Sequence, residues 1–309
     1  MKDKIKIHFV SQAGPHLASH RMRVLKPVSL LNTQTDLIEA TVGAHVDNNA
    51  HVNVFTKHFD QRANLLGIKS DLYKSVFDVC DNHLDGDNAK YYTDMLESAD
   101  KIISNTENMK KAIFKHAGEL SNVIPDPITF PFAEPVVSEK PRLLWFGHGS
   151  NLKSLLPWLD ALSEARRVTV ISNAQIDHPK VDFIPWKPNL VEALIKDFDI
   201  VLIPTDTSNE AHKCKSPNRA VDAIAAGKFV MTDNTEIYGP LEKFVRFIDN
   251  PDKLNDAISS YECNPEYHLE NAKEAQAFVK EKFSDQVILE GWLEVLSDLK
   301  VIKGFKRND

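Results

Sequence analysis

Short apolar runs alternate with amphipathic stretches along the chain, and this pattern predicts strands that are each followed by a helix. In the first half, the apolar runs that predict strands are Lys4–Val10, Val52–Thr56, Ser75–Val79, Lys101–Ser104 and Asn122–Ile124. The stretches that predict helices are Ser19–Leu31, Ala89–Ser98 and Glu107–His116. Short apolar strands that alternate with helices indicate a parallel sheet covered on both faces.

The pattern is interrupted between Pro127 and Pro141 and then starts again. This segment holds four prolines, and proline can continue neither a helix nor a central strand, so we expect a linker there. Beyond it, the predicted strands are Arg142–Phe146, Val168–Ser172, Val181–Ile184, Ile200–Pro204 and Phe229–Thr232. The predicted helices are Leu152–Leu162, Asn189–Lys196, Pro217–Ala226, Pro265–Lys282 and Asp285–Leu299.

The repeated pattern predicts an α/β fold with two Rossmann-like domains that face each other across a cleft. A length of 309 residues fits two domains. We expect an N-terminal domain over residues 1–138, a C-terminal domain over 139–284, and a terminal helix, 285–309, that crosses back to the N-terminal domain. Ligands of open parallel sheets bind outside the carboxyl ends of the strands, so we expect the functional site in the cleft.

The composition argues against some classes of protein. With 42% hydrophobic and 26% charged residues, the chain has the composition of an ordinary globular protein. A net charge of -7 argues against a nucleic-acid partner, because such proteins usually carry basic stripes. Three widely separated cysteines, Cys80, Cys214 and Cys263, indicate a reducing compartment and no disulfide framework.

The chain has no apolar run of about 20 residues that would span a membrane, so we expect a cytoplasmic protein. The last predicted helix is amphipathic and is followed by a basic end. Cations near the end of a packed helix explain that pattern, since they suit the helix dipole. Peripheral contact with the inner membrane face is the alternative.

The segment from Cys214 to Gly227 carries the strongest chemical signal. Ser216 suits the N-cap of a helix, and Pro217 suits the first helical position. The start of a helix favours an anion through its free N–H groups and its dipole. Lys215 and Arg219 add two cations, and a diphosphate is an anion that suits this arrangement.

Asp222 lies further along the same predicted helix, on the face shared with Asn218 and Arg219. A carboxylate there is placed to accept the hydroxyls of a ribose whose diphosphate lies at the helix start. The alternative is a capped surface helix in which Arg219 and Asp222 form an ion pair.

Several segments resemble, in the expected order, glycosyltransferases of the GT-B type, particularly the bacterial "group 1" nucleotide-sugar transferases. The first is ADKIISNTENMKKAI followed by VIPDPI, which is similar to the end of the family's N-terminal domain. LLWFGHGSN is similar to the first strand and turn of the donor domain, and DIVLIPTDTSNEAHKCKSPNRAVDAIAAGKFVMT to the nucleotide-sugar segment. The resemblance covers nearly the whole chain.

The resemblance implies contacts between the donor phosphates and the turn Gly147, His148, Gly149, Ser150 and Asn151. The two glycines also let a backbone approach a ligand closely, although a tight strand–helix turn explains them equally well. In the resembled fold the loop that holds Trp186 lies by the nucleotide base, where an aromatic face can stack.

The sequence departs from the family at one position of the nucleotide-sugar segment. The family commonly has two glutamates eight residues apart. Asp222 stands in place of the second, and Cys214 in place of the first. The first glutamate is either missing or replaced by Glu210, and Lys215 is expected to take part of its role.

The N-terminal domain is expected to supply residues from the carboxyl ends of its first strands. Arg21 is a candidate for the diphosphate, and His20 for positioning an acceptor hydroxyl. Asp78 and Asp81 flank the end of a predicted strand, and one of them is a candidate base. The Asp85–Asp87 sequence DGD is expected to be a solvated loop, so we expect no metal site and no required cofactor.

These observations predict an enzyme that moves a sugar from a nucleoside-diphosphate sugar to a glycan or glycolipid acceptor in cell-surface polysaccharide or glycoconjugate synthesis. Lys215, Arg219 and the Gly147–Asn151 backbone would offset the charge of the leaving group without a metal. By resemblance, the anomeric configuration is expected to be retained. The alternatives are a sugar-nucleotide epimerase or hydrolase that uses Asp78 with Asp81, and a non-catalytic nucleotide-sugar binding protein.

Overall fold

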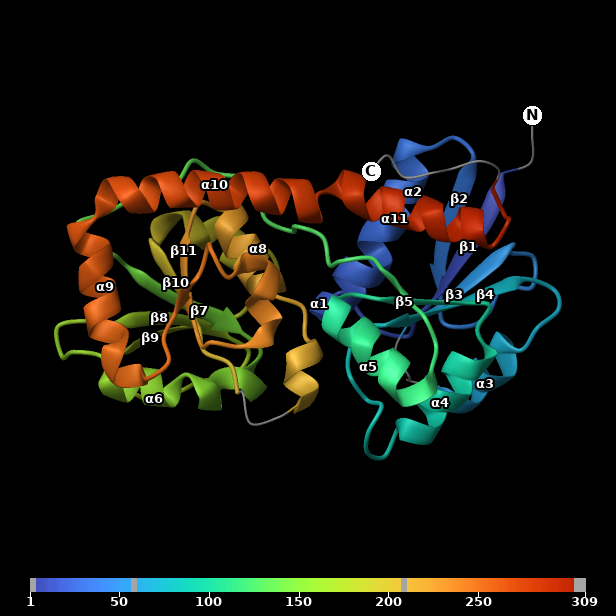
Figure 1. The fold of residues 1–309 in the computed structure, drawn as a ribbon, viewed down its shortest axis with the longest axis horizontal. Coiled ribbons are helices and arrows are strands. Elements are labelled where there is room, and N and C mark those ends of the chain that lie inside the picture. Colours follow the sequence, from blue (N-terminus) through green and yellow to red (C-terminus); the bar gives the residue numbers. More distant parts are fainter. Residues whose placement is uncertain (1–3, 57–59, 207–209, 303–309) are drawn as a thin grey trace. The chain divides into compact units, whose positions relative to one another are not determined.

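The computed structural model describes residues 4–56, 60–206 and 210–302, which form two compact units. Unit 1 comprises Met1–Pro127, Cys214–Ser216 and Phe283–Asp309, and unit 2 comprises Ile128–Lys213 and Pro217–Lys282. Each unit holds one parallel sheet of six strands with helices packed against it (Figure 1). The predicted fold class, α/β with Rossmann-like units, is therefore confirmed.

The sheet of unit 1 has the strand order β2-β1-β3-β4-β5-β6. The strand order reverses between β1 and β3, which are adjacent and parallel. Apolar residues fill its central strands, and β3 is buried at all five positions. The bounds are β1 Ile5–Val10, β2 Ile38–Gly43, β3 Val52–Thr56, β4 Lys74–Val79, β5 Lys101–Ser104 and β6 Asn122–Val123.

The first helical segment of unit 1 contains a π-helical turn. It consists of α1 (Ala18–His20), a π segment (Arg21–Leu25) and α2 (Lys26–Gln34). Such turns often lie at functional sites. The other helices are α3 Gln61–Ile68, α4 Ala89–Ser98 and α5 Glu107–Ala117.

The terminal helix α11 (Asp285–Asp298) is part of the hydrophobic core of unit 1. The Trp292 ring meets Phe9 of β1 edge-on, with ring centroids 5.1 Å apart. Gly291 lies so close to Ile124 that a Cβ atom would come within 3.1 Å of the isoleucine side chain. Gly291, which has no side chain, and the large Trp292 ring thus allow α11 to pack closely on the sheet. This helix lies beside α2 (Figure 1).

The sheet of unit 2 has the order β12-β11-β10-β7-β8-β9. The strand order therefore reverses between β7 and β10, as in a dinucleotide-binding sheet. The strands are β7 Leu143–Gly147, β8 Val168–Ser172, β9 Val181–Pro185, β10 Ile200–Ile203, β11 Phe229–Thr232 and β12 Arg246–Phe247. The helices are α6 Leu156–Ala161, α7 Leu190–Leu194, α8 Asn218–Ala225, α9 Leu254–Cys263 and α10 Pro265–Phe283.

The proline-rich segment forms neither helix nor strand between β6 and β7, as the sequence predicts. Ala133 of this segment donates its N–H to the Ala225 carbonyl at the end of α8. Gln276 of α10 donates to the carbonyls of both Ala133 and Ala225, at 2.7 and 2.9 Å. These bonds attach the segment to α8 and α10 within unit 2.

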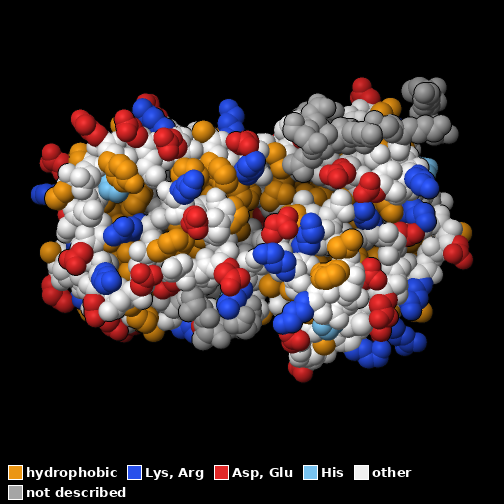
Figure 2. Space-filling view, in the orientation of Figure 1, with side chains coloured by type: hydrophobic (Ala, Val, Ile, Leu, Met, Phe, Trp, Pro, Cys, Tyr) orange, Lys and Arg blue, Asp and Glu red, His pale blue; other side chains and the backbone are white. Residues whose placement is uncertain are grey.

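Among the described strands and α-helices, four were not predicted from the sequence: β2, α3, β12 and α9. One predicted helix is also different, because residues 149–154 form a 3-10 helix before α6 begins at Leu156. Figure 2 shows that the basic and acidic side chains are interspersed over the face in view. Among the described residues, no helix is long and apolar enough to cross a bilayer.

Candidate functional site

The reversal of strand order in unit 2, between β7 and β10, indicates where a ligand would bind on its sheet. At such a reversal the loops after the two central strands diverge, and ligands bind in the crevice outside the carboxyl ends. In this chain those ends are Gly147 of β7 and Ile203 of β10. We therefore take the residues that follow these strands, and the start of α8, as the candidate site.

The turn after β7 is held tightly by polar contacts. The Gly149 N–H donates to Asn173 Oδ1 at 2.8 Å, and His148 Nδ1 lies 2.9 Å from Ser150 Oγ. A Cβ atom on Gly149 would lie 2.4 Å from the Ala174 Cβ, so a larger residue does not fit without movement. The turn is thus fixed from the end of the neighbouring strand β8, and Asn151 follows in the 3-10 helix.

Arg219, in the first turn of α8, reaches the end of β7. Its Nη1 donates to the Phe146 carbonyl at 3.2 Å, and its Cζ lies 5.8 Å from the centre of the Trp145 ring. Gly147 leaves room for it, since a Cβ there would come within 3.1 Å of Nη1. Burial lowers the pKa of Arg219.

None of the described carboxylates pairs with Arg219, whose guanidinium donates to the Phe146 carbonyl. The ion pair between Arg219 and Asp222, which the surface-helix alternative requires, is therefore not formed. Arg219 is half-buried, and partial burial of a cation without a carboxylate partner is unfavourable unless an anion binds it. Arg219 is thus suited to contact an anion at the end of β7.

Asp222 lies on α8 and is almost completely buried, with 4% of its surface exposed. Its Oδ1 accepts the Thr129 N–H at 2.6 Å and the Phe130 N–H at 3.3 Å, and its Oδ2 accepts the Thr129 hydroxyl at 2.6 Å. The carboxylate therefore holds the start of the proline-rich segment. Its predicted role toward a ribose stays a prediction.

The helix that holds these residues begins at Asn218, with Pro217 at its N-cap and no side-chain cap. The prediction of Ser216 as N-cap and Pro217 as first helical residue is therefore wrong by one position. Asn218 Oδ1 instead accepts the Arg219 N–H at 2.8 Å. Lys215 and Ser216 group with unit 1 together with Cys214.

Other strand ends of unit 2 contribute residues that the sequence did not single out. The Thr205 N–H donates to Asp233 Oδ2 at 2.6 Å, which joins the ends of β10 and β11. Burial raises the pKa of Asp233. The sequence offered one signal for these residues, which is their position one or two residues after an apolar strand: Asn173, Thr205 and Asp233.

Two other candidates of unit 2 can be placed only in part. Trp186 follows β9 and is half-buried. The side chain of Glu210 lies outside the described part of the chain.

In unit 1, His20 is buried at the end of α1. Its Nδ1 lies 3.0 Å from Ser11 Oγ, just beyond β1. Burial lowers its pKa, and the neighbouring His16 lowers it further. Arg21 donates to the Pro15 carbonyl at 2.8 Å. Both candidate residues thus lie near the carboxyl end of β1, at the strand-order reversal of this sheet.

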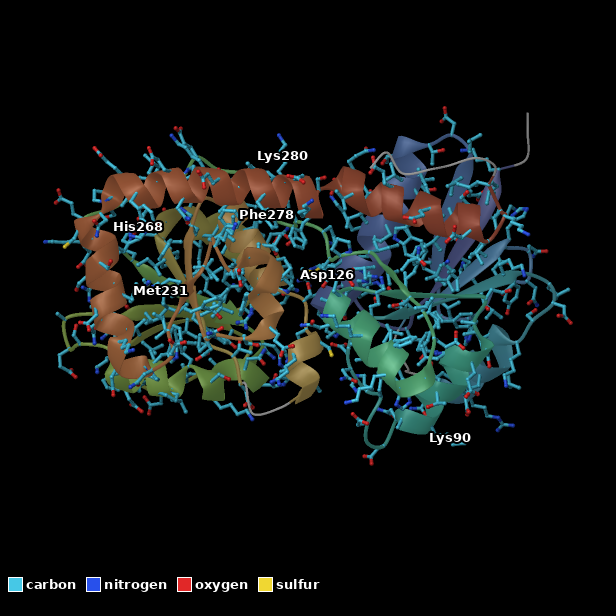
Figure 3. All side chains as sticks on the ribbon, in the orientation of Figure 1. Lys90, Asp126, Met231, His268, Phe278 and Lys280 are labelled. Atoms are coloured by element: carbon cyan, nitrogen blue, oxygen red, sulfur yellow. The ribbon has the colours of Figure 1, made fainter. Side chains whose placement is uncertain are left out.

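Asp78 is not placed to act as the candidate base. Arg23 Nη2 donates to Asp78 Oδ1 at 2.7 Å and Arg23 Nε donates to Oδ2 at 3.0 Å, with both side chains buried. Asp126 lies 3.4 Å from Arg23 Nη1 (Figure 3 labels Asp126). These carboxylates raise the pKa of Arg23 despite its burial. The Asp78–Asp81 pair of the epimerase alternative thus has one member bound to an arginine.

Asp81 follows β4 and is half-buried, with its Oδ2 3.8 Å from the Cys80 Sγ. Asp85 and Asp87 of the DGD sequence are exposed. Among the described residues, no group of three or more His, Cys, Asp or Glu side chains is arranged to hold a metal ion.

No protein-family model matches the chain, and no curated protein matches it in sequence. Solved structures match in fold. HepE from Anabaena in complex with UDP-glucose has a TM-score of 0.73 at 13% identity, over 95% of this chain and 99% of that chain. Sucrose-phosphate synthase from Thermosynechococcus elongatus has a TM-score of 0.72 at 10% identity, over 96% and 100%.

An α-glucosyltransferase in complex with UDP-glucose and DNA has a TM-score of 0.66 at 9% identity, over 96% of this chain and 100% of that chain. At these identities the likeness establishes the fold. The chain has the GT-B fold, as its sequence resemblance implies.

Proposed function

We propose that this protein is a glycosyltransferase that moves a sugar from a nucleoside-diphosphate sugar to an acceptor hydroxyl. The observation that carries the proposal is Arg219, a half-buried cation with no carboxylate partner among the described residues, at the strand-order reversal of a GT-B fold. UDP-glucose in two of the similar structures favours a UDP-sugar as donor.

Departure of a nucleoside diphosphate leaves negative charge on its phosphate oxygens. In the proposed site, the Arg219 guanidinium and the first N–H groups of α8 offset that charge. We assign the Gly147–Asn151 turn to the same phosphates, and the bond from the Gly149 N–H to Asn173 Oδ1 holds this turn in place. We assign Lys215 to the same diphosphate and expect no required metal.

The nucleoside is expected to lie further along the sheet of unit 2. Asp222 is our candidate for the ribose hydroxyls, and its carboxylate also accepts from Thr129. Trp186 is our candidate for stacking on the base, because it follows β9 and is half-buried. We assign the donor to residues 139–284 and expect the anomeric configuration to be retained.

We assign the acceptor to residues 1–138, with His20 positioning the acceptor hydroxyl and with Arg21 and Asp81 as further candidates. A glycan or glycolipid of the cell surface is the acceptor that the sequence resemblance favours. Sequestration of Asp78 by Arg23 disfavours the epimerase alternative, which needs a free carboxylate pair. A binding protein without activity stays the second candidate, because Cys214 replaces the first family glutamate.

Release of free nucleoside diphosphate, measured for a panel of UDP-, GDP- and ADP-sugars, tests the proposal. A transferase releases it only when an acceptor extract is present, whereas a hydrolase or hydrolysing epimerase releases it without acceptor. Binding without release in every extract identifies a binding protein. A DNA acceptor arm is included, because one of the similar structures holds DNA. The same assay in EDTA tests the expected metal independence.

A further inference from the structure

The loops that follow β10 and β11 are joined at the carboxyl edge of the unit 2 sheet. These strands are adjacent and parallel, with Ile203 level with Thr232, so their loops leave the sheet side by side. Thr205 follows β10, and Asp233 follows β11. The Thr205 N–H donates to Asp233 Oδ2 at 2.6 Å, and this bond holds the two loops together.

Asp233 has acceptor capacity that the protein does not use. Its half-buried carboxylate accepts from the N–H groups of Thr205 and of Asp233 itself, and it pairs with no cation among the described residues. A carboxylate has about four acceptor positions. Partial burial of an unpaired carboxylate is unfavourable unless further donors bind it. Asp206, in the same loop as Thr205, differs because it pairs with Lys153 at 3.4 Å.

Tyr238 connects this carboxylate to Arg219. Its hydroxyl lies 3.4 Å from Thr205 Oγ1. It also lies close enough to Arg219 to act on its pKa, which burial lowers and Tyr238 raises. Arg219 in turn donates to the Phe146 carbonyl at the end of β7. A sugar attached to a diphosphate at Arg219 would therefore have Thr205 and Asp233 among its neighbours.

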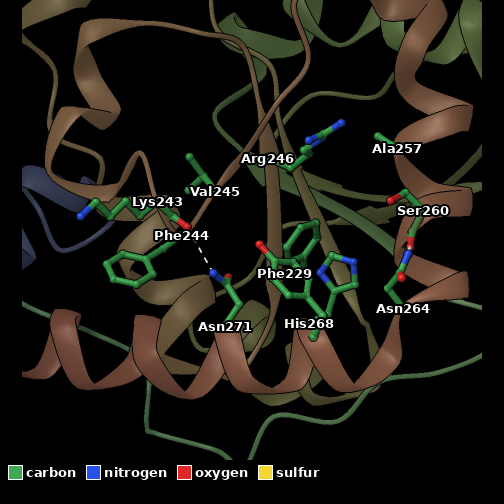
Figure 4. A pocket seen from close by; sticks show the side chains of 11 residues that line it. Phe229, Lys243, Phe244, Val245, Arg246, Ala257, Ser260, Asn264, His268 and Asn271 are labelled. Carbon is green, nitrogen blue, oxygen red and sulfur yellow. Dashed lines mark hydrogen bonds between the residues drawn. The ribbon is translucent and has the colours of Figure 1, made fainter.

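The other end of the same sheet is less suited to the sugar. A cavity of about 330 Å³ lies there, lined by Phe229 at the start of β11 and by residues of α9 and α10 (Figure 4). The described residues that line it include no carboxylate. Asn271 in this cavity donates to the Lys243 carbonyl, as the dashed line in Figure 4 shows. Ligands of parallel sheets bind at the carboxyl ends of the strands, so the sugar is expected beside Asp233.

We propose that Asp233 accepts hydroxyl groups of the donor sugar, and that this sugar is neutral and rich in hydroxyls. The proposal rests on the proposed function and on the assignment of the diphosphate to Arg219. A carboxylate forms strong, charge-assisted hydrogen bonds with hydroxyl donors. It repels a second carboxylate at short range, so a donor that carries a sugar acid is disfavoured.

Calorimetric titration of the intact protein with UDP-glucose and UDP-glucuronate tests the role of charge. The two sugars differ only at C6, where glucuronate carries a carboxylate. We expect the wild type to bind UDP-glucose at least tenfold more tightly. Asp233→Asn keeps an oxygen for the Thr205 N–H and should reduce this preference to less than threefold. Asp249→Asn is the matched control, because Asp249 is exposed after the neighbouring strand β12, and it should keep the preference.

A second titration tests the hydroxyl contact at constant charge. UDP-glucose is compared with four analogues that lack the 2-, 3-, 4- or 6-hydroxyl of the glucose. At least one analogue should bind the wild type tenfold more weakly than UDP-glucose does, because it leaves Asp233 without a donor. The same analogue should lose less than threefold in Asp233→Asn, since the charged hydrogen bond is already gone.

Three results would overturn the proposal. The first is wild-type affinity for UDP-glucuronate equal to that for UDP-glucose, and the second is an Asp233→Asn protein with both preferences unchanged. The third is an equal change in Asp249→Asn, which would show a long-range effect of charge. Titration with UDP alone separates this proposal from the donor assignment. Absence of UDP binding contradicts the donor assignment itself, whereas UDP binding with unchanged sugar preferences contradicts only the role of Asp233.

Discussion

The buried Arg23 guanidinium binds both oxygens of Asp78 in a two-pronged ion pair, at 2.7 and 3.0 Å. The pair joins the π-helical turn after α1 to the end of β4, and Asp126 approaches the same guanidinium at 3.4 Å. Three buried charged groups thus fix the first helix of unit 1 against its sheet. The charge of Arg23 thereby compensates the charges of Asp78 and Asp126.

Replacing this cation should destabilise unit 1 severely. Arg23→Met leaves Asp78 and Asp126 buried without their partner, which costs about 3–5 kcal/mol of unfolding free energy. Urea unfolding measures the loss. Lys101→Met is the control, since Lys101 pairs with Asp298 at 2.6 Å near the surface of the same unit and should contribute less than about 1 kcal/mol. Equal losses in the two variants would show that burial adds nothing to the Arg23 network.

The same network shows what the sequence could not predict. Asp78 and Asp81 both follow an apolar strand and read alike as candidate bases, because strand ends can be placed from the sequence. The structure separates them because Arg23 binds Asp78. Arg23 lies 55 residues before Asp78 in the sequence and is positioned by the π-helical turn. Contacts of this range depend on packing, so they appear only in the structure.

Among the strands, burial decided which were predictable. Continuous apolar runs such as Val52–Thr56 and Val168–Ser172 were predicted with the bounds that the structure has. The edge strand β2 was not predicted, because three of its residues are exposed and its sequence IEATVG is only partly apolar. The two-residue strand β12 is too short to have a pattern at all.

Arg219→Ala should weaken binding of the nucleoside diphosphate by about 1.5–3 kcal/mol, the scale of a charged hydrogen bond. Isothermal titration with UDP and GDP measures this change. Arg167→Ala, an exposed arginine before β8 in the same unit, is the control and should bind normally. An Arg219→Ala protein with unchanged affinity would leave the arginine with a structural role only.

Gly149→Ala should distort the turn that we assign to the donor phosphates. The new methyl group would lie 2.4 Å from the Ala174 Cβ, and overpacking of this kind costs about 1–3 kcal/mol. The expected result is lower stability together with weaker binding of nucleoside diphosphate. Gly149→Ala combined with Ala174→Gly removes the contact, so the double variant should recover both properties. A double variant as impaired as the single one would contradict the steric account.

Acid should destabilise the protein through its buried histidines. The pKa values of His20 and His268 are lowered in the folded state, whereas the unfolded chain has values near 6.5. Below about pH 6.5 the unfolded chain therefore binds more protons, so the free energy of unfolding falls as the pH falls.

The two histidines can be separated by substitution. Urea unfolding between about pH 7.5 and 5.5 should show a smaller loss for His20→Gln than for the wild type, with the exposed His116→Gln on α5 of the same unit as the control. An identical slope for His20→Gln and wild type would mean that His20 is protonated equally in both states.

Asp222 accepts from Thr129 and is also our candidate for the ribose, and two substitutions separate these roles. Asp222→Asn places an amide N–H against the N–H or hydroxyl of Thr129, so it should lower both stability and ribonucleotide affinity, each by about 1–3 kcal/mol. Thr129→Val removes only the hydroxyl partner of Asp222 Oδ2 and should lower stability alone. A 2′,3′-dideoxy nucleotide lacks the ribose hydroxyls, so its affinity should change little in Asp222→Asn. Equal losses of affinity for the two nucleotides would withdraw the ribose role and leave Asp222 as the residue that holds the proline-rich segment on α8.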